Sequence, residues 1–445
     1  MTLIINGGRP LQGRVVIGGA KNAALPIIAA TLLTADECLL ENVPDIEDTR
    51  NMVRVLHSMG VAARFEGQGR LRIKATRINR ANLPVDLARA MRASFLIVGP
   101  LLSRFGQAEA PHPGGCAIGT RPVSVDLKAF QEMDSTVDIE GEYYVIRTPR
   151  LKGRRIMLDY PSHTGTENVV MAACLAEGTT IIDNASIEPE VSDLADFLNA
   201  MGARVYGAGT HTIRIDGANR LHGTVYRVMP DRMEAGTFAL AAMITRGSVT
   251  MDARVARWLG ALNSKLESAG AQVSVTGSDY TVIAPQRMKP TDIQTYPYPG
   301  FPTDLQAPYT TTMTQAEGIS SVHETMFDNR LSYAAELAKM GAHIDVSGSG
   351  RTAMVHGPTP LHGTRVNALD IRSGAAVVLA GLAADGVTEV GSTGIIERGY
   401  EDLAGKLRAL GADIKLQEEG RLGSPANVMG EPLEWGTVPY SVTAS

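Results

Sequence analysis

The sequence predicts an α/β protein built from six similar units of about 70 residues each. A turn residue that ends an amphipathic stretch recurs along the whole chain, at Gly60, Asp134, Gly202, Gly270, Gly341 and Gly411. Successive markers are 74, 68, 68, 71 and 70 residues apart. Earlier in each unit, a short extended stretch leads into a segment rich in small residues. Two features at one nearly constant spacing indicate an internal repeat.

Length and composition agree with this prediction. The chain has 445 residues, 44% hydrophobic and 20% charged, which is typical of a soluble globular protein rather than a disordered one. Lys and Arg number 42 against 47 Asp and Glu, a net charge of −5, so no diffuse positive field favours nucleic acid or an anionic membrane as partner. Any site for an anion must therefore be local.

The N-terminal segment and the cysteines predict a cytoplasmic protein. The start MTLIINGGRPLQG lacks the pattern of a signal peptide, and the apolar run 23–33 is shorter than the roughly 18 residues of a membrane span. Three widely spaced cysteines do not form a disulfide framework. Cys38 and Cys174 lie in apolar runs and are expected in the core, whereas Cys116 lies in a Gly- and Pro-rich stretch and is expected on an exposed loop.

Each marker glycine is interpreted as a helix cap. Leu194, Phe197 and Leu198 recur at helical spacing before Gly202, and the alternating stretch 203–206 follows it. A glycine at this point favours the left-handed conformation that ends a helix. Each unit is therefore expected to contain a helix, a tight turn and a strand.

The segments rich in small residues predict buried helices. In chain order they occupy residues 15–33, 87–103, 156–176, 226–244, 297–314 and 366–383. A helix that is apolar on every face belongs at the centre of a domain, with sheets packed around it. Their first turns are expected to meet at a common opening and carry Lys21, Asn22, Arg92, Asp231, Arg232, Asp304, Asp370 and Arg372. Helix N-termini and basic side chains together favour anion binding.

Six short motifs then carry a family resemblance. They are GAKNA at 19–23, MRAS at 91–94, PGGCAIGTRP at 113–122, FPTD at 301–304, FDNR at 327–330 and RGYE at 398–401. In residues, order and spacing the sequence resembles the UDP-N-acetylglucosamine enolpyruvyl transferases (1-carboxyvinyltransferases) of the EPSP synthase superfamily, over about residues 3–416. The resemblance implies an inside-out α/β barrel of six βαβαββ units, with three units in each of two globes and the active site between them.

The domain boundaries expected from this resemblance follow the repeat. Residues 21–229 form one globe, and residues 1–20 with 230–416 form the other. Residues 417–445, rich in Gly, Pro and Ser, are expected to be a loosely attached tail.

The resemblance also implies a reaction. The enolpyruvyl group of phosphoenolpyruvate moves to the 3′-hydroxyl of UDP-N-acetylglucosamine and phosphate leaves, by addition and then elimination. This is the first committed step of peptidoglycan synthesis, and hence of cell-wall biogenesis, cell shape and cell division. No metal or organic cofactor is implied, and the nine histidines form no HExxH motif. The two small substrates are the implied partners, without nucleic acid, membrane or an obligate protein.

Roles of individual residues come from the same resemblance. Cys116 is implied as general acid and fosfomycin target, and Asp304 as proton acceptor, with Lys21 and Arg398 completing the catalytic set. The phosphoenolpyruvate site is implied to be Lys21, Asn22, Arg121, Arg372 and Arg398. The UDP-N-acetylglucosamine site is implied to be Asn22, Arg92, Arg121, Pro122, Val123, Ser124, Ser162, His163, Asp304, Met326 and Arg330. Without the resemblance, Asp304 is also explained as a helix N-cap.

Two departures from the family pattern lie on the nucleotide side. Ser124 stands where the family usually has Asp, and His163-Thr164 replaces a small Val-Gly step. We favour an enzyme with rearranged nucleotide contacts, in which Asp126 or His163 takes over. Alternatives are a paralogous enolpyruvyl transferase for a different nucleotide or nucleotide sugar, and a catalytically silent binding member. The Cys116 loop and FPTD disfavour the EPSP synthase branch itself.

Overall fold

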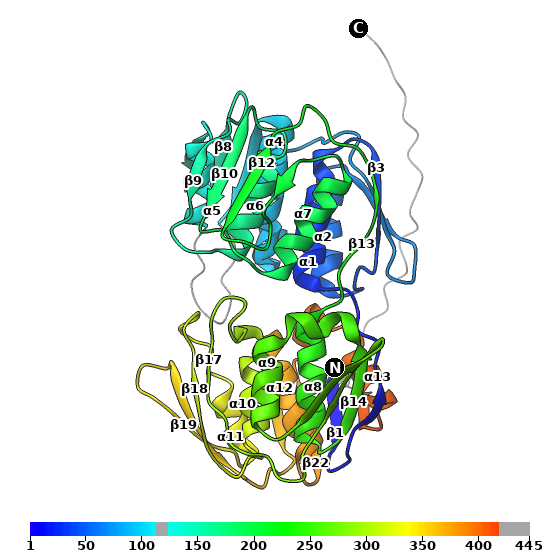
Figure 1. Cartoon of the computed structure of the whole chain (residues 1–445). Helices are drawn as coiled ribbons and strands as arrows, with labels where there is room; N and C mark the ends of the chain where they lie inside the picture. The colour runs from blue at the N-terminus through cyan, green and yellow to red at the C-terminus, as the bar shows by residue number, and fades with distance from the viewer. Residues whose placement is uncertain (113–122, 418–445) are drawn as a thin grey trace, which may run out of the picture.

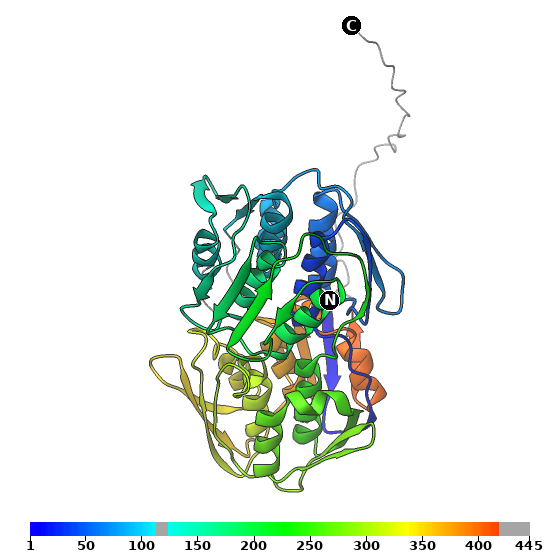
Figure 2. The same cartoon turned by 45° about the horizontal axis from the view of Figure 1, so that its top comes forward.

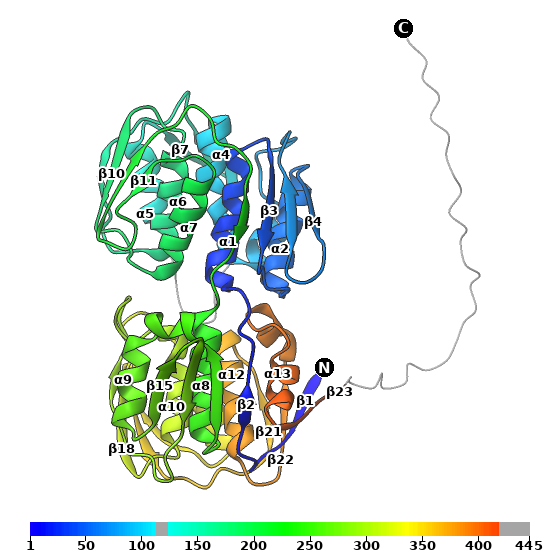
Figure 3. The same ribbon diagram turned by 45° about the vertical axis from the view of Figure 1, so that its right-hand side comes forward.

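The computed structural model describes residues 1–112 and 123–417, which form two stacked lobes (Figures 1 and 2). The upper lobe runs from α1 to β13, and the lower lobe consists of β1, β2 and the chain from α8 to β23. The chain therefore crosses between the lobes twice, just before α1 and just before α8. Figure 3 shows the first crossing, from β2 in the lower lobe into α1.

The elements of the upper lobe follow in chain order. They are α1 (Lys21–Ala30), the 3-10 helix η1 (Thr31–Leu33), β3 (Glu37–Glu41), α2 (Glu47–Ser58), β4 (Ala62–Phe65), β5 (Leu71–Lys74), α3 (Val85–Ala90), the 3-10 helix η2 (Arg92–Ile97), α4 (Val98–Phe105), β6 (Gln107–Pro111), α5 (Ser124–Glu132), β7 (Thr136–Glu140), β8 (Tyr143–Arg147), β9 (Arg155–Met157), α6 (His163–Ala173), β10 (Thr179–Asp183), α7 (Pro189–Ala200), β11 (Val205–Tyr206), β12 (Thr212–Asp216) and β13 (Val225–Arg227).

The lower lobe is built from the N-terminal strands and the second half of the chain. Its elements are β1 (Thr2–Asn6), β2 (Gln12–Arg14), α8 (Arg232–Ile244), β14 (Ser248–Asp252), η3 (Ala253–Trp258), α9 (Gly260–Ser268), β15 (Gln272–Thr276), β16 (Asp279–Ile283), β17 (Ile293–Gln294), η4 (Thr303–Leu305), α10 (Gln306–Met313), β18 (Gly318–His323), α11 (Ala334–Lys339), β19 (His343–Val346), β20 (Thr352–Gly357), β21 (Arg365–Asn367), α12 (Ile371–Ala383), β22 (Val387–Gly391), η5 (Thr393–Arg398), α13 (Leu403–Ala409) and β23 (Asp413–Gln417).

The sheets confirm the six-unit repeat. Within the described residues there are five four-stranded sheets, β21-β22-β1-β23, β11-β12-β10-β9, β13-β3-β5-β4, β15-β16-β14-β2 and β17-β18-β20-β19, and one three-stranded sheet, β6-β8-β7. Each four-stranded sheet joins one parallel pair to two antiparallel pairs. The three-stranded sheet has only an isolated parallel bridge, between Asn82 and Glu109, where the other units have a strand.

The marker residues adopt the predicted left-handed conformation. Gly60, Gly202, Gly270, Gly341 and Gly411 have φ between +86° and +103°. Asp134 has φ +68° after α5, which belongs to the unit with the three-stranded sheet. Asp tolerates this region better than most residues with a Cβ, so the divergent unit keeps the same turn without glycine.

The helices rich in small residues are buried, as their composition predicts. All thirteen residues of α8 and eight of the ten in α1 are buried. Buried side chains gather in two hydrophobic clusters, one spanning Ala20 to Met229 and the other joining Leu3 to Ile17 with Met233 to Ile414. We retain residues 21–229 and 1–20 with 230–416 as the proposed domains. The proposed tail lies outside the described residues except for Gln417.

The expectations for the described cysteines are confirmed. Cys38 and Cys174 are both free and buried. Burial raises the pKa of Cys38 to about 11 and that of Cys174 to about 12, which makes both thiols unreactive. No helix in residues 1–112 or 123–417 is long and apolar enough to cross a bilayer.

Candidate active site

Charged side chains from both lobes meet where the N-terminal ends of the buried helices converge. The backbone N–H of Lys21, which begins α1, donates to Asp231 Oδ2 at 3.3 Å. Asp231 is the N-cap of α8 and also accepts from the backbone of Met233 and Glu234. The start of the upper-lobe helix α1 thus touches the start of the lower-lobe helix α8, as the predicted common opening requires.

Asp304, in η4, lies between two arginines of the lower lobe. Its Oδ1 accepts from Arg330 Nη2 at 3.0 Å, and its Oδ2 accepts from Arg372 Nε at 3.0 Å and Nη2 at 2.8 Å. Partial burial favours the neutral carboxyl, but Arg372, Arg330 and the more distant Lys21 outweigh it and hold the pKa of Asp304 well below its ordinary value. Asp304 is therefore ionised at neutral pH.

The explanation of Asp304 as a helix cap does not hold. The N-cap of η4 is Pro302 and that of α10 is Leu305, and neither helix has a side-chain cap. Both oxygens of Asp304 are bonded to guanidinium groups instead. The carboxylate thus lies at the centre of a charged cluster.

Asp48 is a member of this cluster that sequence reasoning missed. Its Oδ2 lies 2.7 Å from Lys21 Nζ and its Oδ1 accepts from Arg398 Nε at 2.9 Å. Lys21 belongs to the upper lobe and Arg398, at the end of η5, to the lower lobe, so this buried carboxylate joins the two lobes. In the sequence Asp48 is one of two acidic residues in the first turn of α2, a common pattern at helix starts.

Several residues predicted for the nucleotide side line one small pocket. Its walls include Arg92, Val123 and Thr164, together with Asp126 and Asn168. Asp126 Oδ1 accepts from Asn168 Nδ2 at 2.9 Å. Burial raises the pKa of Asp126 to about 6, although Asn168 and Arg92 oppose that rise. Ser124, the first residue of α5, lies directly after Val123.

Ser162 and His163 already have protein partners at the start of α6. Ser162 Oγ caps the helix by accepting from the backbone N–H of Gly165 at 3.1 Å. His163 Nε2 lies 3.1 Å from the buried Glu167 Oε1. Burial disfavours the imidazolium, but Glu167, Glu190 and Glu188 prevail and raise the pKa of His163.

Arg232, the first residue of α8, faces the same acidic group. Its Nε donates to Glu190 Oε1 at 2.9 Å, and its Nη2 donates to Glu188. Its guanidinium also lies over the Tyr298 ring, 5.3 Å from the centroid. Because α7 belongs to the upper lobe, this is a second ionic contact between the lobes.

The remaining predicted residues differ in their surroundings. Asn22 follows Lys21 in α1 and is half-buried, and Met326 is exposed, with its backbone N–H donating to Glu324 Oε1 at 2.7 Å. Arg330 and Arg372 are buried against Asp304. Cys116, Arg121 and Pro122 lie outside the described residues.

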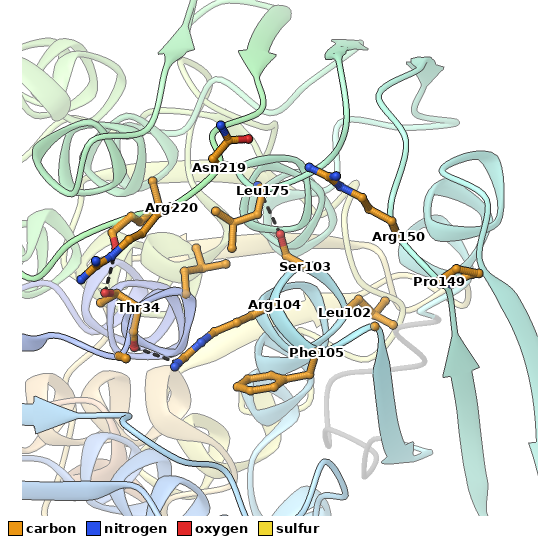
Figure 4. Close-up of a pocket in the computed structure, with 14 residues that line it drawn as sticks. Thr34, Leu102, Ser103, Arg104, Phe105, Pro149, Arg150, Leu175, Asn219 and Arg220 are labelled. Atoms are coloured by element: carbon orange, nitrogen blue, oxygen red, sulfur yellow. Dashed lines mark hydrogen bonds between the residues drawn. The ribbon is translucent and has the colours of Figure 1, made fainter.

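A second depression lies at the far end of the upper lobe. Figure 4 shows it between the ends of α4 and α6, lined by Thr34, Ser103, Arg104 and Arg150 among others. Arg104 Nη1 donates to the carbonyls of Leu32, Thr34 and Ala75 at 2.8–2.9 Å. None of the predicted site residues lines this depression, so it is not the candidate site.

The chain is similar to known proteins over most of its length. Residues 5–407 match the family model described as EPSP synthase (3-phosphoshikimate 1-carboxyvinyltransferase). UDP-N-acetylglucosamine 1-carboxyvinyltransferase 2 of Carboxydothermus hydrogenoformans is 47% identical over 93% of this chain and 98% of its own length. UDP-N-acetylglucosamine 1-carboxyvinyltransferase 1 of Caldanaerobacter subterraneus is 45% identical over 92% of this chain and 98% of its own.

Solved structures agree with the fold. The enolpyruvyl transferase NikO from Streptomyces tendae is 25% identical with a TM-score of 0.84, over 93% of this chain and 98% of its own. EPSP synthase from Acinetobacter baumannii, at 18% identity and a TM-score of 0.71 over 94% of this chain and 100% of its own, shares the fold. The predicted inside-out α/β fold is thereby confirmed. This chain belongs to the EPSP synthase family of carboxyvinyltransferases and, within it, to the UDP-N-acetylglucosamine 1-carboxyvinyltransferases.

Proposed function

We propose that the enzyme transfers the enolpyruvyl group of phosphoenolpyruvate to the 3′-hydroxyl of UDP-N-acetylglucosamine and releases phosphate. The observation that carries the proposal is the cluster of Lys21, Arg330, Arg372 and Arg398 around Asp304 and Asp48, at the junction of the lobes. Both substrates are anionic, and a concentrated group of cations binds anions despite a net charge of −5. Relatives of 45–47% identity carry the name of this activity.

Residues of this chain in the proposed roles supply the proton transfers of the addition and the elimination. The Cys116 thiol gives its proton to the methylene carbon of phosphoenolpyruvate while the 3′-oxygen of the acceptor bonds to the adjacent carbon. The hydroxyl proton passes to Asp304. The Cys116 thiolate then takes a proton back from the new methyl group while the carbon–oxygen bond to phosphate breaks, which regenerates the double bond. Phosphate leaves with the proton that Asp304 received.

Asp304 needs its arginines displaced in order to accept that proton. Its ion pairs with Arg372 and Arg330 lower its basicity. The phosphate or carboxylate of the donor competes for the same guanidinium groups and relieves this effect. Binding of the donor therefore raises the basicity of Asp304 at the moment when the acceptor hydroxyl must be deprotonated.

The pair formed by Lys21 and Arg398 plays an equivalent part on the other side of the cluster. Both cations form ion pairs with Asp48, Lys21 from the upper lobe and Arg398 from the lower lobe. A bound phosphate accepts from the same donors, and Asp48 keeps them in position before it arrives. The phosphate group thus links the lobes through the same two side chains.

A second candidate is transfer to a different nucleotide or nucleotide sugar. It is favoured by the side chains at the departures from the family pattern, since Ser162 caps α6 and His163 pairs with Glu167. Among the described residues that line the pocket with Arg92, Asp126 is the carboxylate available for nucleotide contacts under either candidate. The two candidates differ only in the acceptor.

In the cell, the proposed activity belongs to the cytoplasm and to peptidoglycan synthesis during the cell cycle. The same proposal makes the Cys116 thiolate a target of the epoxide antibiotic fosfomycin. Mass spectrometry of the treated protein should show one adduct on Cys116. An unmodified Cys116 would contradict the proposed activated thiolate.

The deciding experiment measures phosphate release by the purified full chain with phosphoenolpyruvate and UDP-N-acetylglucosamine. Turnover is expected, and Cys116→Ala should abolish it. Turnover with another nucleotide but not with UDP-N-acetylglucosamine selects the second candidate. Turnover with shikimate 3-phosphate alone selects the EPSP synthase reaction, and no turnover with any acceptor supports a silent binding member.

A further inference from the structure

Two histidines and an aspartate converge on the outer sheet of the lower lobe, away from the candidate active site. His343 on β19 is the register partner of His356 on β20. Asp345 lies two residues after His343 and therefore projects from the same face of β19. β19 is the edge strand of the sheet β17-β18-β20-β19, at the outer edge of the lobe (Figure 1).

The three side chains direct ligand atoms at one point. Asp345 Oδ2 lies 2.9 Å from His356 Nε2 and 3.6 Å from His343 Nε2. One ligand atom from each residue lies within 4.8 Å of the others. Ligand atoms about 2.0–2.1 Å from a tetrahedral zinc ion stand roughly 3.3 Å apart, and the two distances fall on either side of that value.

We propose that His343, Asp345 and His356 form a binding site for a divalent transition metal of the zinc class. Two imidazoles and a carboxylate suit Zn²⁺, Ni²⁺ or Cu²⁺, whereas Mg²⁺ and Ca²⁺ prefer a shell of oxygen ligands. Three protein ligands leave the fourth tetrahedral position for water. The site is separate from the carboxyvinyl transfer, and the metal takes no part in it.

Small side-chain rotations complete the site. The two imidazole rings are stacked, with centroids 4.1 Å apart and planes at 14°. Their nitrogen lone pairs converge on one ion only when the rings turn away from each other. The side chains are 60% and 31% exposed, and Asp345 is 66% exposed, so they turn without disturbing the core. The hydrogen bond between His356 and Asp345 is then replaced by two metal bonds.

The test is calorimetric titration of Zn²⁺ into the full chain carrying Cys116→Ala, which removes a competing thiol. The parent should bind one equivalent through this site. His356→Ala and Asp345→Asn should each weaken that affinity at least about tenfold, since even loss of a supporting group around a metal costs 10- to 100-fold. The matched control is His222→Gln, another exposed histidine that lies outside the cluster, which should leave binding unchanged.

A spectroscopic readout separates this site from binding elsewhere. With one equivalent of Cu²⁺, electron paramagnetic resonance of the parent should show coupling to two imidazole nitrogens. His343→Gln should reduce the coupling to one nitrogen, while circular dichroism verifies that the fold is kept. An unchanged zinc affinity in His356→Ala, or an unchanged copper spectrum in His343→Gln, would overturn the proposal.

Discussion

The carboxylates Asp304, Asp48 and Asp126 show how neighbours set the chemistry of one residue type. Asp304 is ionised because Arg372 and Arg330 outweigh the effect of its partial burial. Asp126 is fully enclosed, with an amide as hydrogen-bond partner, and its pKa is raised to about 6. Asp48 is buried between Lys21 and Arg398, which belong to different lobes. The same side chain type therefore serves as proposed base, as a buried carboxyl with a raised pKa and as a bridge between the lobes.

Asp304→Asn should lower kcat about 10²- to 10⁴-fold, because an amide cannot accept the hydroxyl proton. The KM for the nucleotide sugar should change much less. Asp328→Asn is the matched control, because Asp328 is an exposed carboxylate that pairs with Arg351 outside the cluster. Steady-state phosphate release gives both constants. Full activity of Asp304→Asn would remove Asp304 from the proposed proton transfer.

Asp126→Asn should stabilise the protein above pH 6. The pKa of Asp126 is raised to about 6 from an ordinary value near 3.8, so the folded state binds the proton more tightly than the unfolded state. The free energy of unfolding therefore falls as the pH rises from about 4 to about 6, because Asp126 ionises, and it keeps this lower value above pH 6. Two pKa units correspond to about 3 kcal/mol, and Asn removes this cost while still accepting from Asn168.

Urea unfolding of the parent and Asp126→Asn at pH 4, 5, 6 and 7.5 measures this difference. The gain in unfolding free energy should grow across pH 4 to 6 and then stay constant. An equal difference at all four values would mean that Asp126 titrates normally.

At the scale of single residues, the sequence predicted which residues belong to the site better than it predicted which residues they contact. The motifs contain Lys21, Asp304, Arg330 and Arg398, and the first turn of a segment rich in small residues adds Arg372. The structure brings these five together. Asp48 was missed because an acidic residue in a first helical turn is common and nothing local marks a contact 350 residues away. His163 and Glu167 have a helical i, i+4 spacing, which is common on exposed helix faces. The sequence does not show that this pair is buried.

At the scale of helices and strands, most of the correct predictions came from the repeat. Five marker glycines and Asp134 all end helices in the left-handed region, because the chain must reverse there into a strand. The exchange of strands between units was not predicted: β2 pairs with β14 and β13 with β3, across 236 and 186 residues. Such pairings depend on how whole units pack against each other, and the local periodicity of the sequence carries no information about that packing.

Gly411→Ala should destabilise the protein by about 1–2 kcal/mol through backbone conformation alone. Gly411 has φ +102°, and a Cβ there would meet nothing within 4 Å, so no steric clash contributes. The matched control is Gly260→Ala at the start of α9, where a Cβ also meets nothing and φ is not left-handed. That change should be neutral or stabilising, by up to about 1 kcal/mol.

Chemical unfolding of both variants beside the parent measures the contrast. Equal effects of Gly411→Ala and Gly260→Ala would show that the left-handed turn is not what requires glycine after α13.

At the scale of the whole molecule, the lobes have separate cores and ionic contacts between them. The buried residues of each hydrophobic cluster lie within one lobe, and Trp258 of the lower lobe packs against the cluster of the upper lobe. Between the lobes lie the pairs of Asp48 with Arg398 and of Glu188 and Glu190 with Arg232. Ion pairs can be exchanged for substrate anions without exposing a core, so relative movement of the lobes is inexpensive.

Under the proposed function, binding of UDP-N-acetylglucosamine should draw the lobes together, because the residues proposed to contact it come from both lobes. Closure excludes water, which protects the donor and the addition intermediate from hydrolysis. Small-angle X-ray scattering should show a smaller radius of gyration with saturating nucleotide sugar. Asp345→Asn, on the outer sheet, should close as the parent does, whereas Arg92→Ala should need a higher concentration because it weakens the proposed nucleotide contacts. Identical radii with and without the nucleotide sugar would contradict the predicted closure.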